Sequence, residues 1–230
     1  MIEASDKIQL KQRIGLLSQG KRVALALLFC ERMVPTLNKF AKETGFDSSV
    51  YREHLDDAWR NLDQGTSSSD YGEAAKQCLD HAPDTEDFIH PLMSAALNAA
   101  LSVVETMEFL ADNDVNHLVE VAVLARVTAA SYAQLMAATP PHSLNYDEVL
   151  EHPLVQHELQ QQADDLEFLE ALPADTLAMI PLIKERAART PALLLPENWP
   201  ATPFGANDLL ANSRVADRWL RKGWLAPWEP

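Results

Sequence analysis

The chain has 230 residues, of which 47% are hydrophobic and 23% are charged, values typical of a globular protein with a buried core. Its two cysteines are too few for a disulfide framework, and its net charge of −15 weakens the case for nucleic-acid binding, because that charge repels phosphates. The longest candidate for a membrane-spanning run, Val23 to Cys30, is far shorter than the roughly 20 residues needed, so the sequence predicts a cytoplasmic protein without membrane contact.

Apolar residues at helical spacing predict two helices at the start of the chain, over residues 6–17 and 21–44. Pro35 lies inside the second helix and is expected to kink it or break it locally, because proline lacks the amide that the helix needs. Gly45 follows at the position where a helix commonly stops.

Two further helices are predicted before residue 80. Asp47 is placed to cap the first of them, and Asp70 opens a shorter one that ends near Leu79. The first has the apolar stripe of an amphipathic helix, made by Tyr51, Leu55, Ala58, Trp59 and Leu62.

The two longest apolar segments, 91–111 and 114–138, are predicted to pack as an antiparallel central pair. Pro91 stands at the expected first helical position, and the link between the segments is very short. The first segment carries one narrow polar stripe, and Leu101 is expected to be buried. The stripe consists of Ser94, Asn98, Ser102 and Glu105.

Helices are also predicted over 146–151, 153–172 and 174–189, and no segment alternates as a β-strand does. The sequence therefore predicts an all-α protein, a single bundle of eight or nine helices in residues 1–195. Residues 196–230 hold four of the five tryptophans, a load that disordered segments rarely carry. We predict that this extension is ordered, contains a helix over 208–222, and packs on its own body or on a neighbouring chain.

Charge is distributed unevenly. Residues 46–183 hold four basic and 25 acidic side chains, whereas both ends of the chain are mildly basic. The acidic middle is therefore predicted to form a recognition surface for a protein partner.

Several histidines lie near carboxylates, but their positions favour structural roles. Asp87 with His90 and Asp114 with His117 have the three-residue offset of a metal pair, yet both lie near helix starts, where an aspartate usually caps. The pairs around Glu148 and Glu158 are predicted to lie on a solvated face. No phosphate-binding loop or nucleophile motif is present, so we predict no metal, no cofactor and no catalytic residues.

Two charged positions on apolar helices need another explanation. Glu31 and Arg32 precede Pro35, where freed backbone groups need partners, and they are predicted to form a local ion pair or a structural bond into the kink. Arg126 is isolated on an apolar helix, so we predict that it is buried against a carboxylate, with Glu105 as the candidate partner.

A run of residues resembles a known bacterial family. It comprises Cys30-Glu31-Arg32-Met33, Pro35, Phe40, Thr44-Gly45-Phe46, Tyr51-Arg52, Leu55-Asp56 and Trp59. Weaker similarity continues at 117–121 and in the segment from Asp147 to Glu158, so that the resemblance covers about residues 8–190. These residues resemble the YjaG-like family of unknown function (domain of unknown function 416), which implies a helical fold and supplies no catalytic residues.

Three functional hypotheses follow, of which nucleic-acid binding through the mildly basic ends of the chain ranks last. The first is a non-enzymatic interaction or structural protein that acts as a homo-oligomer, a dimer being favoured, through its acidic surface. The second is a ligand- or metal-binding bundle, enzymatic or not, with a polar pocket near Glu31, Glu105, His117 and Glu120. Together with Arg32 and Arg126, these four residues form the candidate polar cluster.

Overall fold

The structure is a computed structural model that describes residues 4–67, 70–84, 86–137, 144–173 and 177–193. The predicted C-terminal extension over 196–230, with its helix at 208–222, lies outside the described residues.

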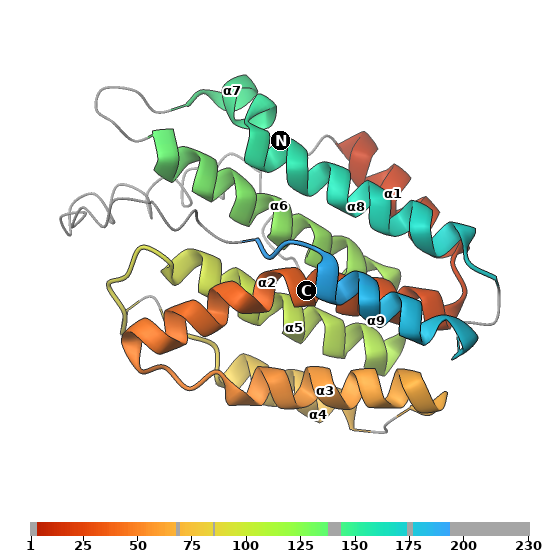
Figure 1. Ribbon diagram of the computed structural model, residues 1–230. Coiled ribbons are helices and arrows are strands. Elements are labelled where there is room, and N and C mark those ends of the chain that lie inside the picture. Colours follow the sequence, from red (N-terminus) through yellow and green to blue (C-terminus); the bar gives the residue numbers. More distant parts are fainter. Residues whose placement is uncertain (1–3, 68–69, 85, 138–143, 174–176, 194–230) are drawn as a thin grey trace.

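The described residues form an all-α protein, which confirms the predicted fold class (Figure 1). Nine α-helices and one 3-10 turn are present in these ranges, within the eight or nine helices expected. They are α1 Ala4–Leu16, α2 Gln19–Thr44, α3 Ser49–Gln64, α4 Tyr71–Asp80, α5 Met93–Asp112, α6 Val115–Ala137, α7 Tyr146–Glu151, α8 Pro153–Ala171, η1 Leu177–Met179 and α9 Ile180–Arg189.

Glycine and short polar residues stand at the ends of several helices. α2 stops where Gly45 adopts φ 80°, and its amide bonds to the Ala41 carbonyl. The predicted cap of α3 was one residue off, because the N-cap residue is Ser48; Asp47, just before it, accepts the Ser49 amide through a carboxylate oxygen. The α5–α6 link turns at Asn113, which has φ 62°. The predicted start of α5 at Pro91 was wrong by two residues, since the helix begins at Met93.

The predicted central pair is present. The Asn98 side chain in α5 donates to Thr128 Oγ1 in α6 at 3.1 Å, and Glu105 bonds His117 at 2.7 Å. Because the partner number falls as the α5 number rises, the two helices run antiparallel. Asn98 and Glu105 of the polar stripe therefore face α6, whereas Ser94 is exposed and the Ser102 carbonyl accepts from Cys30 Sγ of α2. Leu101 is only half-buried, contrary to expectation, because it lies off the side of α5 that holds Met107.

α2 is the third helix of the core and contacts α5, α6 and α8. It continues as a helix through Pro35. In the turn that Pro35 disturbs, the Arg32 carbonyl accepts the Leu193 amide at 2.8 Å. Thr36 Oγ1 donates to the Leu193 carbonyl at 2.6 Å. The segment after α9 is thus fastened to the middle of α2.

Among the described helices, only Val115–Met136 of α6 is long and apolar enough to span a bilayer, with a mean hydropathy of 1.3. The prediction that Val23–Cys30 is the longest candidate for a membrane-spanning run was therefore wrong. Most of it (61%) is buried against other helices, as in the core helix of a bundle.

The remaining helices cover this core on two sides. α3 and α4 lie along one side, against α2 and α5, at the lower edge of Figure 1. α1 and α8 pack against α6 on the other side, and α9 crosses the surface of α2. Charged side chains from α2, α8 and α9 meet beneath this surface.

Candidate functional site

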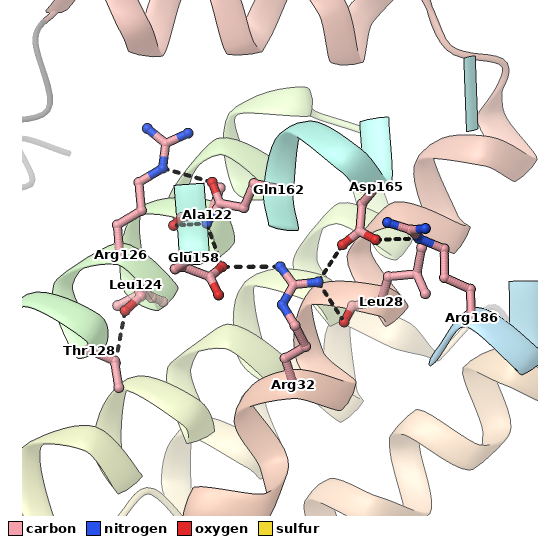
Figure 2. Close-up of polar contacts among 10 residues, drawn as sticks. All are labelled: Leu28, Arg32, Ala122, Leu124, Arg126, Thr128, Glu158, Gln162, Asp165 and Arg186. Atoms are coloured by element: carbon pink, nitrogen blue, oxygen red, sulfur yellow. Dashed lines mark hydrogen bonds and ion pairs between the residues drawn. The ribbon is translucent and has the colours of Figure 1, made fainter. Parts of the chain in front are cut away.

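A buried ion network joins α2 to α8 (Figure 2). Arg32 is only 2% exposed, and its guanidinium donates to Glu158 Oε1 at 3.1 Å and to Asp165 Oδ2. Both carboxylates are also buried. The predicted ion pair at Arg32 is therefore present, but its partners come from a distant helix. Glu158 was wrongly placed on a solvated face.

The network continues in both directions along α8. Asp165 Oδ1 accepts the Arg186 Nε of α9 at 2.6 Å, and Gln162 donates to Glu158 at 2.8 Å and to the Ala122 carbonyl at 3.0 Å. Glu158, Gln162 and Asp165 follow the i, i+4, i+7 spacing of one helix face. Two arginines face two carboxylates, so the network has no excess charge.

Electrostatics hold Arg32 in its charged form. Burial opposes a charged guanidinium, but the carboxylates of Glu158 and Asp165 outweigh it and raise the pKa of Arg32. The guanidinium also lies over the Phe29 ring, 5.1 Å from its centre. Because its charges are paired internally, this network is suited to fixing α2, α8 and α9 rather than to exchanging protons.

Arg126 does not pair with Glu105, so that prediction was wrong. Its Nε donates to Gln162 Oε1 at 2.7 Å, the side chain is half-buried, and burial lowers its pKa. The antiparallel pairing explains the error. Position 105 of α5 lies beside position 117 of α6, whereas Arg126 lies more than two turns further on and faces α8.

His117 is held between two carboxylates at the α5–α6 junction. Nδ1 lies 2.7 Å from Glu105 Oε2, and Nε2 lies 3.2 Å from Asp112 Oδ2. Partial burial opposes the imidazolium, but the two carboxylates prevail and raise the pKa of His117. Burial likewise raises the pKa of Glu105. Asp114 instead caps α6 by accepting the Asn116 amide, the capping role its position predicted.

This arrangement makes stability depend on pH. A raised folded-state pKa means that the folded protein binds the proton more tightly than the unfolded chain does. The contribution of His117 is therefore full below its unfolded pKa of about 6.5 and is lost as pH rises through the higher folded value. Urea melts should show a loss of stability on the alkaline side that His117→Gln reduces. An identical pH profile for this variant would contradict the assignment. His90, whose pKa is lowered by burial, contributes with the opposite sign.

Glu31 binds two side chains of α3. Its carboxylate accepts Arg52 Nη1 at 3.0 Å and the Trp59 indole nitrogen at 2.8 Å. Glu31, Arg52 and Trp59 line an open groove of about 540 Å³ between α3 and α9. The charged lining comprises the bases Arg52, Arg60 and Lys184 and the acids Glu31, Asp56 and Asp63.

A second open groove, of about 420 Å³, runs between α8 and α9. Its floor includes Phe168, whose ring centre lies 4.9 Å from the Arg186 guanidinium carbon. The other charged side chains that line it are Asp164, Glu185 and Arg189. Both grooves therefore contain acids and bases in equal number.

The predicted polar cluster is not assembled as one pocket. Glu105 and His117 meet, whereas Glu120 lies on the surface beside Lys7 of α1, at 3.3 Å. Glu31 bonds to α3, whereas Arg32 and Arg126 both bond to α8, where Gln162 connects Arg126 to Glu158, the partner of Arg32. Within the described ranges, no three His, Cys, Asp or Glu side chains are grouped as ligands for a metal ion.

Comparison with known proteins gives a family. The family model described as "Protein of unknown function (DUF416)" matches residues 9–191. The chain belongs to the DUF416 family. That match confirms the resemblance found from the sequence and nearly coincides with its extent of about residues 8–190.

Relatives of this DUF416 protein include the uncharacterized protein YjaG of Escherichia coli. The two are 25% identical over 176 residues, which cover 71% of this chain and 88% of YjaG. YjaG of Salmonella typhimurium is similar to the same degree. The crystal structure of a DUF416 family protein from Shewanella baltica is 20% identical, with a TM-score of 0.68 over 77% of this chain and 92% of the other. That likeness shows the fold alone.

Sequence reasoning about this DUF416 protein missed the α8 half of the ion network. Glu158, Gln162 and Asp165 share one helix face with the apolar Val155 and Leu169, all of them buried. A polar stripe embedded among apolar residues was the available signal. It was obscured because α8 carries three other acidic residues, Asp164, Glu167 and Glu170, of which the last two are exposed.

Proposed function

We propose that this DUF416 protein is a non-enzymatic interaction protein of the bacterial cytoplasm that self-associates and recognises a partner through an acidic face. The acidic face comprises α3, α4 and the following loop as far as residue 89. Within its described residues, ten carboxylates are exposed against two exposed bases, Arg60 and Lys76. The carboxylates belong to Glu53, Asp56, Asp57, Asp63, Asp70, Glu73, Asp80, Asp84, Glu86 and Asp87.

Two large apolar side chains carry this proposal, because they are exposed within the acidic face. Leu79 is 52% exposed and Ile89 is 76% exposed. Apolar anchors within a polar rim are a common arrangement at protein-binding surfaces. The charge indicates a partner whose contact surface is basic and carries apolar side chains of its own.

The arrangement of the other charged groups supports an interaction role over the ligand-binding alternative. The polar groups of the interior are largely bonded to one another, and the two grooves beside α9 are open and balanced in charge. Glu31, Glu105, His117 and Glu120 do not converge on a common pocket.

The test compares partners captured by three versions of the full chain in a bacterial lysate. Leu79→Ser with Ile89→Ser alters the acidic face, and Ile8→Ser with Leu16→Ser is a matched control, because these two side chains are exposed on α1. A specific partner should be depleted about tenfold or more by the first pair and retained by the control pair.

Two results would count against the proposal. One is a set of partners that the two double variants retain equally. The other is native mass spectrometry that finds a stoichiometric metal ion or small molecule on the purified protein, since this would favour the ligand-binding alternative.

A further inference from the structure

We propose that α9 and the two grooves beside it form a face that binds the same face of a second copy of this chain. This inference rests on the self-association proposed above and names the surface that achieves it. The face is bounded by α3 on one side and α8 on the other, with α9 as the ridge between them (Figure 1).

Charge is the first argument for this surface. The chain has a net charge of −15, so most surfaces of two copies repel each other. In a two-fold dimer the same patch meets itself, and the acidic face would then set carboxylates against carboxylates. The α9 face shares Asp56, Arg60 and Asp63 with the acidic face, but both of its grooves are lined by acids and bases in equal number. The charges of this face therefore do not oppose its contact with the same face of a second copy.

Shape and apolar surface are the second argument. Leu182 is 47% exposed on α9 and lines the α8–α9 groove with Pro191, while Ala187 and Ala188 line the other groove. A helix ridge flanked by hollows of about 420 and 540 Å³ is self-complementary, since the ridge of one copy can enter a groove of the other. Leu182 would be the apolar anchor of this contact.

One competing occupant lies within the same chain. Residues 194–230 begin directly after Leu193, which bonds to α2 beside this face. They carry four bases and four acids, so their charge does not select the acidic face over the α9 face. The test must therefore separate a second copy from this segment.

Sedimentation velocity of the full chain over a range of concentrations tests the proposal. We expect a dimer that Leu182→Asp weakens, raising the dimer dissociation constant by about tenfold or more. Leu79→Asp is the matched control, because Leu79 is exposed to nearly the same extent on the acidic face, and it should leave the dimer unchanged. Circular dichroism melts of both variants check that they fold.

Charge-reversal variants on α9 test the same dimer contact independently. Arg189 and Glu185 form an ion pair on the surface of α9. Arg189→Glu alone should weaken the dimer. Arg189→Glu with Glu185→Arg should restore it, since the α9 face then again carries equal numbers of acids and bases.

The contrary outcomes are distinct. A monomer at every concentration would overturn both this inference and the proposed self-association. A dimer that resists Leu182→Asp but yields to Leu79→Asp would overturn this inference alone and assign self-association to the acidic face. If a chain ending at Leu193 is monomeric where the full chain is dimeric, the C-terminal segment is the occupant and the inference fails.

Discussion

Replacing Arg32 with methionine is expected to lower the free energy of unfolding by about 3–5 kcal/mol, the usual cost of removing one partner from a buried ion pair. Arg32 is buried, and Glu158 has no other charged partner within 4 Å among the described residues. The variant would leave two buried carboxylates facing one arginine, Arg186. Urea or thermal unfolding of the purified variant measures the effect.

Two controls separate the buried charge from the lost volume. Arg126→Met removes a similar side chain that donates a hydrogen bond to a neutral amide, and it should cost about 1 kcal/mol, as for one hydrogen bond. Arg32→Met with Glu158→Gln restores the charge balance around Asp165, so it should be more stable than Arg32→Met alone. The network account would be wrong if Arg32→Met cost no more than Arg126→Met.

Replacing Met107 with alanine is expected to lower the free energy of unfolding by about 2–5 kcal/mol, as for other buried large-to-small changes. Met107 is fully buried on the side of α5 that packs into the core. The cavity left there cannot close easily, because α5 is packed between α2, α4 and α6. Denaturant melts with an unchanged slope would give the loss directly.

Leu101→Ala is the matched control on the same helix. Leu101 is only half-buried, so the lost burial is smaller and a cost of about 1 kcal/mol is expected. An equal or larger loss at Leu101 than at Met107 would mean that α5 turns a different side toward the core.

The helices themselves were readable from the sequence because their signals are local. The face made by Tyr51, Leu55 and Leu62 repeats at helical spacing, and Gly45 ends α2 in a left-handed conformation that few other residues adopt readily. The antiparallel pairing of α5 and α6 followed from their short link, which leaves two long apolar helices little other geometry.

The partners of the charged residues could not be predicted from the sequence in the same way. Arg126 was recognised as unusual from its isolation on an apolar helix, but choosing Glu105 required the register and rotation of α6, which local spacing does not provide. His117 and Glu105 were both singled out, yet their pairing emerged only once the two helices were set side by side.

The sequence by itself determined that this chain is helical, where most of its helices begin and end, and that its middle is strongly acidic, since these properties depend on neighbouring residues or on composition. Only the tertiary structure decided that Arg32 meets Glu158 and Asp165, which lie 126 and 133 residues away along the chain. The physical reason is that such contacts depend on how whole helices are rotated and shifted against one another. That choice is made by the packing of all core side chains together, so no single motif encodes it.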